Sequence, residues 1–152
     1  MKLSLKIPPL ALGIITLLLI WLADRYVPIY HADFVYQNII ASVISGAGLI
    51  VALPGIFAFK KLKTSVDPRY PQKVSKLVII GIYKYSRNPM YLGLLLAIIG
   101  FVFFLGSLAG ILIVILFVLF INKYQIQPEE IVLQQKFGDD YINYTKDVRR
   151  WI

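Results

Sequence analysis

The stretch that decides the fold is Asn88–Asn122, NPMYLGLLLAIIGFVFFLGSLAGILIVILFVLFIN, a run of 35 residues without a charged side chain. As one helix it would be about 52 Å long at 1.5 Å per residue, whereas the hydrocarbon core of a bilayer is about 30 Å thick. The run is therefore too long for a single crossing. A turn at Leu105-Gly106-Ser107 would divide it into a tight hairpin with arms at residues 89–104 and 108–122. Each arm has about 16 residues, enough to cross a locally thinned bilayer or only to re-enter it.

Two further uncharged runs precede the hairpin, at residues 7–23 and 34–59, and 59% of the 152 residues are hydrophobic. Each run is long enough for one membrane helix. The first follows Lys2 and Lys6 as in a signal peptide, but Asp24-Arg25-Tyr26 comes next instead of a small-residue cleavage site, so we expect a retained helix. The sequence predicts an all-α integral membrane protein with one domain over residues 1–152. Four membrane helices would be followed by short C-terminal helices in residues 123–152.

The basic residues predict the orientation of these helices. Eight of them lie between the second and third runs: Lys60, Lys61, Lys63, Arg69, Lys73, Lys76, Lys84 and Arg87. The loop after the first run has only Arg25. Because Lys and Arg near span ends stay on the cytoplasmic side, this loop and both termini should face the cytoplasm, at the cytoplasmic (inner) membrane. The net charge of +8 is spread between apolar runs, so the expected partners are membrane lipids and not nucleic acid.

Small residues indicate where the membrane helices could approach each other. Three pairs repeat at i,i+4, the spacing that lets helix backbones touch in lipid: Ser42 and Gly46, Gly93 and Ala97, and Gly106 and Gly110. Pro54-Gly55 should kink or end the second helix.

A first candidate site is the entry to the hairpin, Arg87-Asn88-Pro89-Met90-Tyr91-Leu92-Gly93. The structural reading is a helix start, with Asn88 as N-cap, Pro89 at the first position and Arg87 at the phosphate level. The functional reading is that the free backbone N–H groups and Arg87 bind a polar or carboxylate-bearing ligand. Tyr91 would add an aromatic surface one turn into the helix.

A second candidate site is Glu129-Glu130, the only acidic residues between Asp67 and Asp139 in the sequence. Acidic side chains in a first helical turn also stabilise the helix dipole, which is the structural reading. Adjacent residues on a helix point about 100° apart, so the two carboxylates should take different partners. One would bind a ligand while the other holds the helix in place.

The C-terminal residues predict two short helices. Pro128 suits a first helical position and Gly138 the residue just past a helix end, and a second helix should begin at Asp139 or Asp140. In it, an apolar stripe recurs every three or four residues: Tyr141, Tyr144, Val148 and Trp151. This stripe would either cover a pocket or lie on the lipid surface.

Taken in order, these motifs resemble the isoprenylcysteine carboxyl methyltransferase family and the related phospholipid methyltransferases. The resemblance rests on Gly81–Gly93, an apolar hairpin, Glu129-Glu130 with Leu133, Phe137-Gly138 with Tyr141 and Tyr144, and Val148–Trp151. It covers about the last 75 residues. It implies a multi-span membrane enzyme that uses S-adenosylmethionine in place of a soluble Rossmann domain, and no Gly-x-Gly-x-x-Gly follows a strand here.

The resemblance also implies site residues. The catalytic residues would be Glu129, Glu130 and Arg87. The cofactor-binding residues would be Tyr85, Arg87, Asn88, Tyr91, Gly93, Glu129, Tyr141 and Tyr144. Two positions depart from the family pattern: many members have His in place of Asn88, and prenylcysteine enzymes tend to have Arg near Gln125.

The methyl acceptor stays open at this stage. Prenylcysteine carboxylate is one candidate, and lipid amines, thiols and other lipophilic acids are the others. A non-catalytic membrane scaffold is a further alternative. A four-span transporter is disfavoured because no ionisable residue lies inside the runs. No metal is expected, since the chain has no cysteine and one histidine, His31.

Overall fold

The computed structural model describes residues 7–27, 32–65, 67 and 69–152, and these form helices and loops with no strand among them. The predicted all-α membrane fold is therefore confirmed. Lys2, Lys6 and His31, which entered the sequence predictions, lie outside the described residues.

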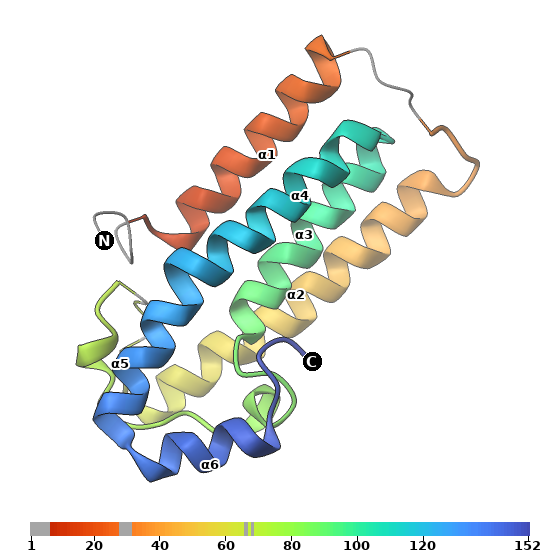
Figure 1. The fold of residues 1–152 in the computed structure, drawn as a ribbon. Coiled ribbons are helices and arrows are strands. Elements are labelled where there is room, and N and C mark those ends of the chain that lie inside the picture. Colours follow the sequence, from red (N-terminus) through yellow and green to blue (C-terminus); the bar gives the residue numbers. More distant parts are fainter. Residues whose placement is uncertain (1–6, 28–31, 66, 68) are drawn as a thin grey trace.

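Four long helices run side by side in an elongated bundle (Figure 1). They are α1 (Pro9–Tyr26), α2 (Gln37–Leu62), α3 (Pro89–Leu105) and α4 (Leu108–Ile121). At one end of the bundle, which we call the polar end, the shorter elements gather: η1 (Pro71–Lys73), η2 (Gly81–Lys84), α5 (Gln127–Phe137) and α6 (Asp139–Asp147). The C-terminus turns back toward the start of α3. The C-terminal residues and the residues at the start of α3 therefore meet at the polar end.

Among the described residues, three helical stretches are long and apolar enough to cross a membrane: Pro9–Tyr26, Gln37–Leu62 and Leu108–Phe137. Helix α3 is also apolar but is shorter, with 17 residues. The predicted turn between α3 and α4 is present, and Gly106 adopts φ 65°, a left-handed conformation that glycine tolerates best. Whether all four helices cross the bilayer stays a prediction.

Close packing of α2 against α3 depends on glycine. A Cβ atom on Gly48 would lie 2.7 Å from the carbonyl oxygen of Gly93, so neither position accepts a side chain without separating the helices. Gly93 was predicted to make such a contact. The prediction for Gly46 is wrong, because nothing lies within 4 Å of its Cβ position; Gly48, half a turn away, faces α3 instead.

Helix α2 continues through Pro54 to Leu62, so it does not end at Pro54-Gly55. The region after Asn122 also differs from the sequence prediction of a new helix at Pro128. Residues Asn122–Ile126 form a π-helix that joins α4 to α5 without a break. A proline has no N–H and its ring crowds the carbonyl four residues earlier, and a wider π turn there relieves that conflict.

Candidate functional site

The site is assembled at the first turn of α3. Asn88 occupies the N-cap position and Pro89 the first helical position, as predicted. The Asn88 side chain makes no capping hydrogen bond. Instead its Nδ2 donates to the carbonyl oxygen of Arg150 at 2.9 Å, and the backbone N–H of Arg87 donates to the carbonyl oxygen of Arg149 at 3.1 Å. The C-terminal segment is thereby held against the hairpin entry.

Glu130 lies between two arginines. Its Oε2 is 2.7 Å from Arg150 Nη2, and its Oε1 is 3.2 Å from Arg87 Nη2. The side chains of Arg87 and Glu130 are only 14% and 17% exposed. Losing one partner of an ion pair that is shielded from water leaves a poorly solvated charge, which is strongly destabilising. Glu130 therefore connects α5 to the hairpin entry and to the C-terminal segment.

Glu129 takes a different partner, as the helical geometry predicted. Its Oε2 accepts a hydrogen bond from Tyr91 Oη at 3.1 Å. Desolvation raises the pKa of Glu129 to about 7, with the hydrogen bond from Tyr91 opposing that shift and the charge of Glu130 adding to it. Glu129 can therefore exchange a proton near neutral pH.

Helix α6 begins at Asp139, as predicted, and places two tyrosines over the site. Tyr144 Oη donates to the carbonyl oxygen of Tyr83 at 2.7 Å, and Tyr141 is buried. The predicted helical stripe is partly wrong, because α6 ends at Asp147 and Val148 is extended. Val148 is nevertheless buried and Trp151 packs against the hydrophobic core, since the extended segment folds back along the bundle.

These elements enclose a cavity of about 580 Å³, within the usual range for a small-molecule site. All but one of the predicted site residues line it: Arg87, Asn88, Tyr91, Gly93, Glu129, Glu130, Tyr141 and Tyr144. Tyr85 does not line the cavity, and it is 73% exposed. Arg87 also has a buried Nε without a hydrogen-bond partner among the described residues.

The cavity has a charged part and an apolar part. From the charged residues near α5 and α6 it extends along the contact of α2 with α3, where Gly48, Leu49, Ala52, Leu94 and Ala97 line it. Two further charged residues, Asp67 and Arg69, and the start of α1 complete the wall. Sequence reasoning missed these two as site residues, because they lie in a polar loop that only the tertiary fold brings to the cavity.

Comparison with known proteins identifies the family. Residues 36–140 match the phospholipid methyltransferase family. The chain belongs to this family. Membership confirms the predicted resemblance and assigns the chain to a family of membrane methyltransferases. The family match includes the hairpin entry and Glu129-Glu130 but ends before Tyr141.

One relative is an uncharacterized protein of Haemophilus influenzae (strain ATCC 51907 / DSM 11121 / KW20 / Rd). It is 48% identical over 63 residues, which make up 41% of this chain and 100% of that protein. No solved structure matches the chain.

Proposed function

We propose that this phospholipid methyltransferase family member transfers a methyl group from S-adenosylmethionine to a lipophilic acceptor at the polar end of the bundle. The observation that carries the proposal is the single cavity that joins buried, charged side chains to an apolar channel between membrane helices. A charged cofactor and an apolar acceptor need both environments side by side.

The charged part of the cavity fits the cofactor chemically. S-adenosylmethionine has a carboxylate, an ammonium and a sulfonium. The unpartnered Nε of Arg87 can donate to a carboxylate, and Glu129 can accept from an ammonium. Asn88, Tyr91, Tyr141 and Tyr144 provide polar and aromatic surface around them.

The bound cofactor would supply an electrophilic methyl group. Methyl transfer requires the acceptor atom in line with that group and water kept out. The backbone contact between α2 and α3 at Gly48 and Gly93 fixes one wall of the cavity, and Tyr141 and Tyr144 of α6 limit access of water from the polar end. Glu130 would act by holding Arg87 and the C-terminal segment in place.

Two acceptor classes remain candidates, and Glu129 bears on the choice. A carboxylate acceptor, as in isoprenylcysteine methylation, is ionised at neutral pH and needs no base. An amine or thiol acceptor must lose a proton, and Glu129, whose pKa burial raises to about 7, would accept that proton if another group binds the cofactor ammonium. This observation supports amine N-methylation or thiol S-methylation as the second candidate. Product analysis with each acceptor class distinguishes them.

The test of the reaction class is calorimetric titration of the detergent-solubilised protein with S-adenosylhomocysteine. The wild-type protein should bind, and Glu129→Gln should weaken binding about tenfold, the effect of losing one charge-assisted hydrogen bond. Asp140→Asn is the matched control, because Asp140 is an exposed acid outside the cavity lining. A wild-type protein that fails to bind S-adenosylhomocysteine would favour the non-catalytic scaffold.

A further inference from the structure

The wall of the cavity contains an ion pair that the proposed chemistry does not use. Arg69 Nη2 lies 2.7 Å from Asp67 Oδ2, and Arg69 Nε lies 2.9 Å from Asp67 Oδ1. The hydrogen bond from the Arg69 side chain lowers the pKa of Asp67, so the carboxylate is ionised at neutral pH. Both side chains line the cavity, and Arg69 is 39% and Asp67 34% exposed.

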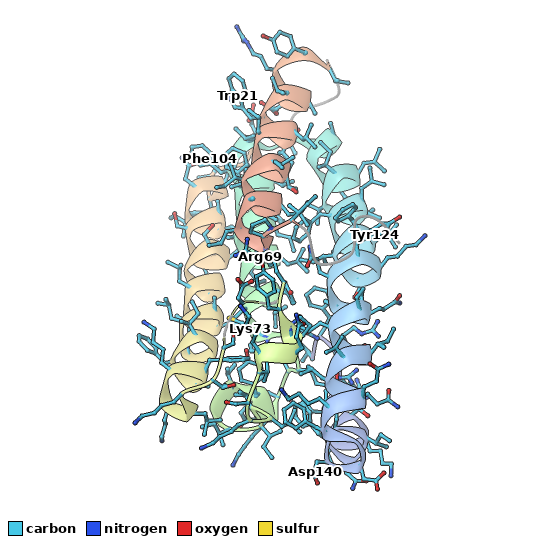
Figure 2. The ribbon with its side chains drawn as sticks, turned by 90° about the vertical axis from the view of Figure 1, so that its left-hand side faces the viewer. Trp21, Arg69, Lys73, Phe104, Tyr124 and Asp140 are labelled. Carbon is cyan, nitrogen blue, oxygen red and sulfur yellow. The ribbon has the colours of Figure 1, made fainter. Side chains whose placement is uncertain are left out.

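The Asp67–Arg69 pair lies at the same depth along the bundle as the N-terminal end of α1. The cavity wall includes Pro8, Pro9 and Leu10, and α1 begins at Pro9. Figure 2 shows Arg69 just beyond that end of α1, and Lys73 farther toward the polar end. A helix that spans the apolar core ends near the lipid headgroups. Arg69 is therefore placed where the headgroup of a lipid in the adjacent leaflet would lie.

The two arginines that line the cavity differ in how firmly they are held. Arg87 is paired with the shielded Glu130, whereas Arg69 is paired with Asp67, and both side chains of that pair are more exposed to water. Exposed ion pairs contribute little to stability, so an incoming anion can replace Asp67 at low cost. Lys73 lies on the ring of Tyr70 at 4.4 Å and Arg69 lies 5.6 Å from the same ring, which adds a second cation nearby.

We propose that Arg69 is a specificity-determining residue that binds an anionic group, phosphate or carboxylate, in the headgroup of the lipid acceptor. The planar guanidinium matches the two oxygens of such a group. Asp67 holds the empty guanidinium in position and is displaced when the acceptor binds. The hydrocarbon chain then lies in the apolar part of the cavity, beside Leu10, Leu49 and Ala52. The assignment of the anion to the acceptor rests on the proposed function.

The cofactor carboxylate is the competing source of the same chemistry. We assign it to Arg87, because Arg87 lines the charged part of the site with Glu129 and the α6 tyrosines, and its buried Nε has no partner among the described residues. Arg69 is on the loop near the start of α1, beside the apolar residues that would hold an acceptor chain.

The experiment measures binding of dodecyl phosphate to the full chain in dodecyl maltoside by calorimetry, with dodecanol, dodecyltrimethylammonium and inorganic phosphate as comparison probes. Arg69→Gln should weaken binding of dodecyl phosphate about tenfold and leave the two other amphiphiles unchanged. Asp67→Asn should strengthen it severalfold, because it removes the competing carboxylate. Lys76→Gln, an exposed lysine of the same loop outside the cavity lining, should have no effect.

Opposite effects of the Arg69 and Asp67 substitutions are the expected result, since a purely structural ion pair would give the same sign for both. Equal weakening by both, or equal effects of Arg69→Gln and Lys76→Gln, overturns the proposal. Inorganic phosphate binding as tightly as dodecyl phosphate would indicate a free-anion site and also overturns it. If Arg69→Gln weakens binding of S-adenosylhomocysteine and not binding of dodecyl phosphate, the anion that Arg69 binds belongs to the cofactor, and the proposal is overturned. Wild-type binding of dodecyl phosphate without S-adenosylhomocysteine would refute the proposed methyl transfer and leave the anion site standing.

Discussion

Glu130→Gln should destabilise the polar end of the bundle, and the contacts of Glu130 set the size of the effect. Removing one partner of a buried ion pair costs about 3–5 kcal/mol. Gln retains one acceptor oxygen, and Arg150 is 34% exposed, so water recovers part of its solvation. We therefore expect a loss of about 2 kcal/mol, which in a chain of 152 residues lowers the melting temperature by about 4–8 °C.

The assay is thermal unfolding followed by far-ultraviolet circular dichroism in dodecyl maltoside at pH 7, together with amide exchange of the C-terminal segment. Exchange at Val148 and Trp151 should become faster in Glu130→Gln, since the segment loses the ion pair between Arg150 and Glu130 and keeps its backbone, Asn88 and core contacts. Glu129→Gln is the matched control, because glutamine can still accept the hydrogen bond from Tyr91. An unchanged melting temperature in Glu130→Gln, or an equal decrease in both variants, would refute the reasoning.

Three further predictions concern pH, cavity closure and topology. Burial raises the pKa of Glu129 from 4.5 to about 7. The contribution of Glu129 to the free energy of unfolding is therefore complete below pH 4.5 and is lost as pH rises through 7. The melting temperature of Glu129→Gln, measured against pH, should lack this loss. Deleting residues after Gly138 should abolish calorimetric binding of S-adenosylhomocysteine while circular dichroism stays helical, and near-normal binding would contradict a cavity role for α6. Ser65→Cys should be labelled by a membrane-impermeant maleimide only from the cytoplasmic side, and labelling from outside would reverse the topology.

The sequence determined the fold class and most of the elements. A charge-free run such as Asn88–Asn122 is stable in a bilayer only when its backbone is satisfied internally, which a helix achieves. Gly106 and Gly138 adopt a positive φ that glycine tolerates best, and α3 ends at Leu105 and α5 at Phe137, directly before them. The ordered motifs from Gly81 to Trp151 were also sufficient to indicate the family.

The tertiary structure decided which of these residues meet. Helical periodicity specifies which face a side chain occupies but not what lies opposite, so Gly48 and not Gly46 contacts α3. Asn88 pairs with the Arg150 carbonyl across 62 residues of sequence, and no local pattern encodes that contact. Asp67 and Arg69 belong to a polar loop, and only the tertiary fold brings that loop to the same cavity as the start of α1. Local preferences are set by each residue and its near neighbours, whereas a cavity exists only once distant helices have packed.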